Sequence, residues 1–280
     1  MVTYQSDHAE DRFVAGPDGE RFHYRRFGAP GGVPLVLCMR LRGTIDHWDP
    51  QLLDALATER EVIVFDNRGT SFTTGTAPTS LDQLADGAIA FIRALGLHQV
   101  DVLGWSLGGI VAQGVALRAP DLVRRLIVAG STPAGVPDQP TPPPRVGEVL
   151  QHAVNDDEDY LYLFFPETEQ GRSAGLASLR RLDTRLVQSK AAVQDSTYRA
   201  QLGAIATFGG YYDRLGELRL PVLVANGAHD VMINSYASYA MSQKLPDAKV
   251  VLYSDAGHGF LFQHIDDFAG EVNSFLGATR

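Results

Sequence analysis

Short apolar runs alternate with segments whose apolar residues recur at helical spacing along most of the chain. Four runs have the unbroken apolar character of strands that are buried on both faces of a parallel sheet. They occupy residues 34–39, 61–65, 100–103 and 126–129. A helix capped by Thr79-Ser80 and extending to about Leu95 is expected between the second and third runs. This alternation predicts an α/β fold with a mostly parallel central sheet and helices on both faces.

The first strands of the chain should differ from the rest, because residues 12–28 have the pattern of an antiparallel hairpin. Two β-type runs flank the turn at residues 16–19, where Pro17 fixes φ and Gly19 accepts a positive φ. Near the other end of the chain, strands are expected at 221–225 and 249–253, followed by a final helix at about 266–276.

The alternation stops between residues 130 and 221. Six prolines within residues 131–145 exclude a regular element there. Four helical segments follow without a strand candidate, at residues 146–154, 158–164, 175–186 and 196–208. We therefore predict a core of residues 1–132 and 214–280 and a helical lid or cap of residues 133–213, which shapes a substrate pocket. The alternative is a helical subdomain that only adds stability.

The chemistry is concentrated where the run at 100–103 ends in Gly104-Trp-Ser106-Leu-Gly108 and a helical pattern begins. This G-x-S-x-G spacing predicts a nucleophile elbow, a strained turn that projects a serine Oγ above the sheet. Gly104 and Gly108 lack the Cβ atoms that would collide with neighbouring backbone. The amide groups and positive dipole end of the following helix would point toward a developing oxyanion.

A serine hydroxyl is a poor nucleophile at neutral pH, so the elbow requires a base and an orienting acid elsewhere in the chain. The best-placed acid is Asp230, in the loop that leaves the strand at 221–225. The best-placed base is His258, in the loop that leaves the strand at 249–253. Both loops follow the carboxyl ends of strands, where open α/β sheets place their sites.

Taken together, these motifs resemble the α/β-hydrolase fold superfamily over essentially residues 10–280. The segments that carry the resemblance are residues 66–69, 104–109, 226–230 and 255–260. The resemblance implies that Ser106 is the nucleophile, His258 the general base and Asp230 the acid that holds the imidazole tautomer. It also implies that the backbone N–H of Leu107 supplies half of an oxyanion hole.

The chain departs from the superfamily pattern after the strand at 34–39, where members usually carry a His-containing pair. Here Arg40 stands where a small residue or histidine is expected. The N–H of Leu41 is still a candidate for the second oxyanion donor, because a main-chain donor does not depend on its side chain. Arg40 is expected either to pair with an acid such as Asp66 or to hold a substrate carboxylate. Pairing is favoured because buried arginines usually need a carboxylate partner.

Aromatic residues provide the remaining candidates for the pocket, together with Arg40. Trp105 is expected to pack under the elbow or to form an aromatic rim of the acyl pocket. Tyr211 belongs to an aromatic group in the insertion and at its end. The group comprises Tyr160, Tyr162, Phe164, Phe165, Phe208, Tyr211 and Tyr212. These residues suggest a small, apolar or ring-containing substrate, although aromatic residues are also ordinary core.

Composition narrows the possible partners and surroundings. The chain has 280 residues, of which 45% are hydrophobic and 20% charged, as in ordinary globular proteins. A formal charge of −9 argues against nucleic acid or an anionic membrane as the partner. Cys38 is the only cysteine, the first residues are polar, and no apolar run approaches the ~20 residues of a membrane helix. A cytoplasmic monomer or homodimer is expected.

The leading hypothesis is a serine hydrolase, without metal or cofactor, that cleaves a small carboxylic ester, lactone or related acyl compound through an acyl-enzyme. Ser106 favours acyl chemistry, because dehalogenases and epoxide hydrolases of this fold use Asp as the nucleophile. One alternative is a non-hydrolytic enzyme of the same fold: a lyase, cyclase, cofactor-free oxygenase or perhydrolase. Arg40 keeps this alternative open. A ligand-binding, receptor-like protein is the third hypothesis.

Overall fold

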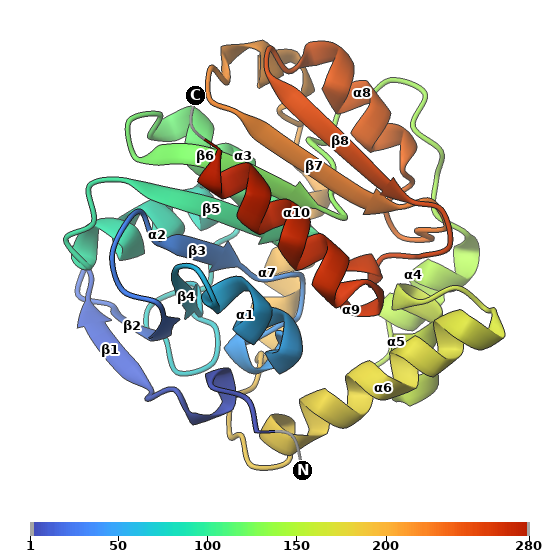
Figure 1. Ribbon diagram of the computed structural model, residues 1–280, viewed down its shortest axis with the longest axis horizontal. Helices are drawn as coiled ribbons and strands as arrows, with labels where there is room; N and C mark the ends of the chain where they lie inside the picture. Colours follow the sequence, from blue (N-terminus) through green and yellow to red (C-terminus); the bar gives the residue numbers. More distant parts are fainter. Residues whose placement is uncertain (1–2, 279–280) are drawn as a thin grey trace.

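The computed structural model describes residues 3–278, which are arranged around a single central sheet. Within these residues, eight strands follow the order β1-β2-β4-β3-β5-β6-β7-β8 (Figure 1). The strands are β1 (Arg12–Ala15), β2 (Arg21–Gly28), β3 (Leu35–Cys38), β4 (Glu61–Phe65), β5 (Val100–Trp105), β6 (Val123–Ala129), β7 (Val222–Gly227) and β8 (Ala248–Tyr253). β1, β2 and β4 pair antiparallel, and all other pairs are parallel. The predicted hairpin and mostly parallel sheet are confirmed.

Helices cover both faces of this sheet, as the strand composition predicts. Along β3, Leu35 and Leu37 face one apolar cluster, whereas Val36 and Cys38 face the other. On the first face lie α1 (Pro50–Ala57), α9 (Phe260–Gln263) and α10 (Ile265–Gly277), in front of the sheet in Figure 1. On the second face lie α2 (Leu81–Ala94), α3 (Leu107–Arg118) and α8 (Tyr236–Lys244). The sheet is therefore buried on both sides, which explains its unbroken apolar runs.

The chain leaves the sheet after β6 for a long helical segment, which we call the insertion, and returns to the sheet at β7. The helices of the insertion are α4 (Pro144–Leu150), α5 (Asp157–Phe164), α6 (Glu169–Leu186) and α7 (Asp195–Ala206), and Figure 1 shows α4 to α6 gathered beyond one end of the sheet. α6 begins six residues before the predicted 175, because the Thr168 hydroxyl accepts the Gly171 N–H at 3.0 Å and caps the helix earlier. α8 was not predicted, since its apolar residues do not form a stripe at helical spacing.

Buried carboxylates fasten the insertion to the core. Asp49 caps α1 and also binds Arg181 of α6, with 2.7 Å between Oδ2 and Nη2. Asp46 follows the same arrangement: it accepts from Arg25 of β2 at 2.5 Å and from Arg185 of α6 at 3.2 Å. The C-terminal half of α6 is therefore joined to the segment between β3 and α1 by charge-assisted hydrogen bonds.

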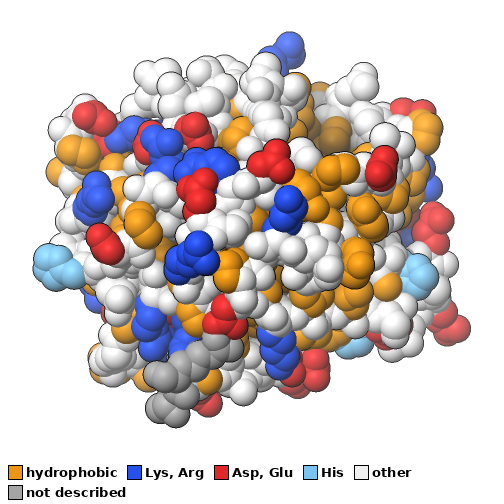
Figure 2. Space-filling view, turned by 90° about the horizontal axis from the view of Figure 1, so that it is seen from above, with side chains coloured by type: hydrophobic (Ala, Val, Ile, Leu, Met, Phe, Trp, Pro, Cys, Tyr) orange, Lys and Arg blue, Asp and Glu red, His pale blue; other side chains and the backbone are white. Residues whose placement is uncertain are grey.

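Three short 3₁₀ helices complete the described elements: η1 (Ser6–His8), η2 (Ile45–His47) and η3 (Tyr212–Glu217). Within residues 3–278, none of the helices combines the length and the apolarity that crossing a bilayer requires. On the face shown in Figure 2, basic and acidic side chains are interspersed rather than gathered by sign.

Candidate active site

Ser106 occupies the sharp turn between β5 and α3. Its backbone has φ 58° and ψ −123°, a strained conformation for a residue with a Cβ. A Cβ on Gly104 would lie 2.1 Å from the carbonyl oxygen of Gly108, and a Cβ on Gly108 would lie 2.0 Å from that of Cys38. Both contacts are far inside van der Waals distance. The two glycines of the motif therefore permit the close approach of β3, β5 and α3 that this turn requires.

His258 and Asp230 come together from the loops after β8 and β7. Nδ1 of His258 lies 2.7 Å from Oδ2 of Asp230, and both side chains are fully buried. The other carboxylate oxygen, Oδ1, accepts the N–H groups of Met232 and Ile233, each at 2.8 Å. Three hydrogen bonds thus fix the carboxylate, and its bond to Nδ1 selects the tautomer in which Nε2 accepts a proton.

The imidazole of His258 is held by aromatic neighbours. Its ring stacks on Phe164 of α5, with 5.6 Å between centroids and 17° between planes. Trp105 packs 5.6 Å from the imidazole and donates from Nε1 to the His258 carbonyl oxygen at 3.1 Å. Nε2 is buried and has no hydrogen-bond partner among residues 3–278, Ser106 included. No hydrogen bond therefore joins the hydroxyl of Ser106 to the imidazole of His258 in this structure.

Ser106 lines a small cavity of about 70 Å³, which we call the Ser106 cavity. The core contributes Arg40, Leu41, Arg42, Ser106 and Met232. The insertion contributes Leu150, Asn155, Tyr160, Leu163, Phe164 and Tyr198. Residues of the insertion thus form part of the wall of this cavity. Nothing in the local sequence pattern separates a cavity wall from ordinary packing for the remaining residues of the lining, which were not predicted: Arg42, Leu150, Asn155, Leu163, Tyr198 and Met232.

The two predicted oxyanion donors are the backbone N–H groups of Leu107, which follows Ser106 in the chain, and of Leu41. Leu107 is the first residue of α3, and Leu41 lines the Ser106 cavity. Neither backbone N–H donates to another group within the described part of the chain. Both N–H groups are thus free for an oxygen atom bound beside Ser106, and the dipole of α3 adds to the donor at Leu107.

Arg40 lies in this site, and no carboxylate of residues 3–278 pairs with it. Its Nη1 donates to the carbonyl oxygen of Leu41 at 2.8 Å, whereas its Nε is buried without a partner in the described residues. The guanidinium carbon lies 5.2 Å from the ring centroid of Phe164 and 5.6 Å from that of Trp105. Burial, and secondarily the neighbouring Arg42, lower the pKa of Arg40 to about 10, so the group is still charged at neutral pH.

The predicted pairing of Arg40 with Asp66 is wrong. One oxygen of Asp66 lies 2.8 Å from His23 Nδ1, and the other accepts the Ile45 N–H at 3.0 Å. β4, which ends at Phe65, lies between β2 and β3 in the sheet, so Asp66 can be reached from either neighbour. His23, from β2, therefore binds the carboxylate that was the expected partner of Arg40.

Tyr211 does not line the Ser106 cavity, so the prediction that it lines the substrate pocket is also wrong. Its hydroxyl donates to Asp82 of α2 at 2.6 Å, and its ring packs beside Gly114 of α3. Trp105 is fully buried beneath the elbow and does not reach the cavity surface, so the packing alternative holds for this residue. Of the predicted aromatic group, Tyr160 and Phe164 line the cavity.

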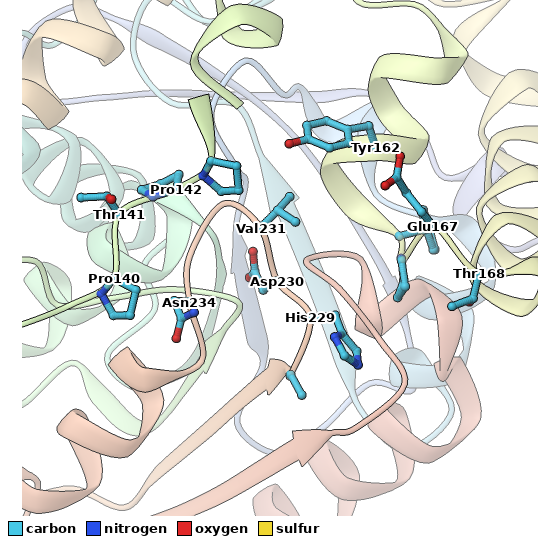
Figure 3. A pocket seen from close by; sticks show the side chains of 14 residues that line it. Pro140, Thr141, Pro142, Tyr162, Glu167, Thr168, His229, Asp230, Val231 and Asn234 are labelled. Carbon is cyan, nitrogen blue, oxygen red and sulfur yellow. The ribbon is translucent and has the colours of Figure 1, made fainter. Parts of the chain in front are cut away.

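A larger surface cleft, of about 560 Å³, lies beside the acid of the site (Figure 3). The Pro-rich residues 140–143, the end of α5 and the loop 228–234 line this cleft. Asp230 borders it, but Ser106 does not, so the smaller Ser106 cavity is where the chemistry can occur. Among the described residues, no group of three or more His, Cys, Asp or Glu side chains is arranged to hold a metal ion.

Comparisons with known proteins agree with this arrangement. The chain is 25% identical to a protein named putative carbamate hydrolase RutD of Azorhizobium caulinodans, over 95% of this chain and 98% of that protein. It is 24% identical to the pimeloyl-[acyl-carrier protein] methyl ester esterase of Aliivibrio salmonicida, over 91% and 95% of the two chains.

A solved structure from Chitinophaga pinensis, described as an alpha/beta hydrolase fold protein, superposes with a TM-score of 0.89 at 33% identity. The match covers 98% of this chain and 99% of that one. The family model for the alpha/beta hydrolase fold matches residues 33–265. The chain therefore belongs to the α/β-hydrolase fold family, and it is a hydrolase of that fold.

Proposed function

We propose that the protein is a serine hydrolase that cleaves a small carboxylic ester, lactone or related acyl compound through an acyl-enzyme. The observation that carries this proposal is the buried 2.7 Å contact between His258 and Asp230 beside the strained elbow of Ser106. A carboxylate fixed in this way orients the imidazole and stabilises it once it is protonated.

The reaction follows from these groups. His258 Nε2 takes the hydroxyl proton of Ser106 as Oγ attacks the acyl carbon, and the N–H groups of Leu107 and Leu41 receive the negative oxygen. Collapse of this intermediate breaks the bond to the leaving group, which takes the proton from His258. Water then attacks the acyl-enzyme with the same base, which releases the acid and restores Ser106.

The names of relatives support acyl substrates without selecting one. They include a putative carbamate hydrolase, a methyl ester esterase and an enol-lactonase, of which the last shares only 20% identity. The small volume of the Ser106 cavity favours a short acyl group over a long chain. Esters, lactones and carbamates of short acids therefore form the first substrate panel.

Labelling with a small fluorophosphonate tests the proposal without knowledge of the substrate. We expect the intact mass of the wild-type protein to increase by a single adduct, and the Ser106→Ala and His258→Ala proteins to remain unlabelled. A wild-type protein that is never labelled would exclude an activated serine. Product analysis then separates hydrolysis, in which one water is added, from the lyase, cyclase or oxygenase chemistry of other members of this fold.

A further inference from the structure

We propose that Arg40 binds a carboxylate of the substrate, so that the compound cleaved at Ser106 is an acyl derivative that carries a second, anionic carboxyl group. This inference rests on the proposed function, because it assigns a substrate class to the same serine site. It is carried by the position of an unpaired guanidinium in the wall of the Ser106 cavity.

The guanidinium of Arg40 has donors to spare. Among the described residues, its one hydrogen bond runs from Nη1 to the carbonyl oxygen of Leu41, and its buried Nε donates to nothing. Among residues 3–278, the titratable side chains that interact electrostatically with Arg40 are Tyr160, Arg42 and His47, and none of them is a carboxylate. A partly buried charge with a buried, unpaired Nε is costly, and a carboxylate of the substrate would supply both a counterion and the missing acceptor.

The other basic side chains near Arg40 are Arg42, which already has hydrogen-bond partners, and His47, which carries no charge. Arg42 donates to the carbonyl oxygens of His152 and Ala153, and its guanidinium packs 4.5 Å from the ring centroid of Tyr198. Burial, followed by the charge of Arg40, lowers the pKa of His47 to about 3, so this histidine is neutral. Of the two arginines that line the Ser106 cavity, Arg40 is therefore the one available to a ligand.

The same aromatic rings connect Arg40 to the catalytic base. Phe164 and Trp105 each contact both the guanidinium of Arg40 and the imidazole of His258. The cavity volume of about 70 Å³ places the two carboxyl groups of the substrate only a few atoms apart.

Monomethyl succinate and methyl butyrate provide a matched pair of test ligands, since they differ only by a terminal carboxylate in place of a methyl group. Each is added as a competitor while Ser106 is labelled by a small neutral fluorophosphonate. We expect the anionic ester to protect Ser106 of the wild-type protein at a concentration tenfold to 100-fold lower than the neutral ester. Arg40→Met should abolish this difference. Arg145→Met, which removes an arginine that packs on Tyr162 outside the Ser106 cavity, should retain it.

The outcomes separate the two proposals. Absence of labelling in the wild type contradicts the proposed function itself. Labelling with equal protection by both esters, or a preference that survives in Arg40→Met, overturns only the carboxylate anchor. A folded Arg40→Met protein that is no longer labelled would place Arg40 in the oxyanion site and overturn the anchor as well. Should Arg40→Met not fold, Arg40→Gln removes the charge but keeps a polar side chain, and an undiminished preference in it would overturn the proposal.

Discussion

The carbonyl oxygen of Phe164 accepts the backbone N–H of Gly259 at 2.6 Å, which joins the end of α5 to the loop that carries His258. The ring of the same Phe164 stacks on the imidazole and lines the Ser106 cavity. One residue of the insertion therefore touches the base, the guanidinium of Arg40 and the space for the acyl group. The insertion and the base loop form one packed unit.

Shortening this side chain should change which acyl groups are accepted. Phe164→Ala is expected to enlarge the Ser106 cavity and to shift the preferred ester toward longer acyl chains. It should also lower the free energy of unfolding by about 3 kcal/mol, because Phe164 is buried in the apolar cluster that includes Trp105. Initial rates over a series of acyl chain lengths, together with a denaturant titration, measure both effects. An unchanged chain-length profile would show that Phe164 does not limit the acyl site.

Asp230→Asn tests whether the acid acts by orienting the imidazole. The amide can present its N–H₂ group to Nδ1, which favours the wrong tautomer, so kcat should fall by about 10⁴ while the fold persists. Asp255→Asn is the matched control, since Asp255 forms a similar 2.9 Å contact with His264 at a more exposed position. This control should keep its activity. Comparable losses in both variants would point to loop disruption rather than to orientation of the base.

The ion pairs of Asp46, which join the insertion to the core, should make the free energy of unfolding sensitive to acid. Burial alone would raise the pKa of Asp46, but Arg25, Ser189 and Arg185 outweigh burial and lower this pKa below its usual value. The stabilisation is therefore fully present above about pH 4, the unfolded pKa, and is lost as the pH falls through the lower folded pKa.

The Asp46→Asn variant provides the measurement. It should unfold about 3 kcal/mol more easily at pH 7, because Arg25 loses its buried counterion. Its free energy of unfolding should also vary less between pH 5 and pH 3 than that of the wild type, as followed by urea titration at each pH. Parallel pH dependence in the two proteins would contradict the role of Asp46.

The elbow glycines should tolerate no side chain. Gly108→Ala would put a Cβ 2.0 Å from the carbonyl oxygen of Cys38, so little folded protein is expected. Gly203→Ala in α7 is the control, because a Cβ there meets nothing within 4 Å and alanine favours a helix by about 1 kcal/mol. Thermal unfolding distinguishes the two. A Gly108→Ala protein as stable as the wild type would show that the elbow is not tightly packed.

Much of the core could be predicted from the sequence because its signals are local. The strand-to-helix step around Ser106 and the turn at Gly19 each arise from a few adjacent residues whose backbone preferences agree. The loops that hold Asp230 and His258 were located from the strands before them, since parallel strands end at one edge of a sheet.

The partners of the charged residues could not be predicted in the same way. Asp66 and Arg40 follow neighbouring strands, yet His23 holds Asp66 because β4 has a strand on each side. Likewise, the hydroxyl of Tyr211 is used by Asp82, which is 129 residues away in the chain. Such contacts depend on which of several side chains reaches a given polar group in the folded chain. Local sequence patterns do not contain this information.

Arg42 joins the core to the insertion, because it donates hydrogen bonds to the carbonyl oxygens of His152 and Ala153. These bonds bear on the rate at which a ligand binds. Any opening of the insertion would have to break these hydrogen bonds, which would leave a second guanidinium free beside Arg40 in the cavity wall. The two guanidinium groups would then create a local positive field on a chain whose formal charge is −9. Anionic ligands would be drawn to that mouth and repelled elsewhere, so their association rate constant should fall steeply as salt is added.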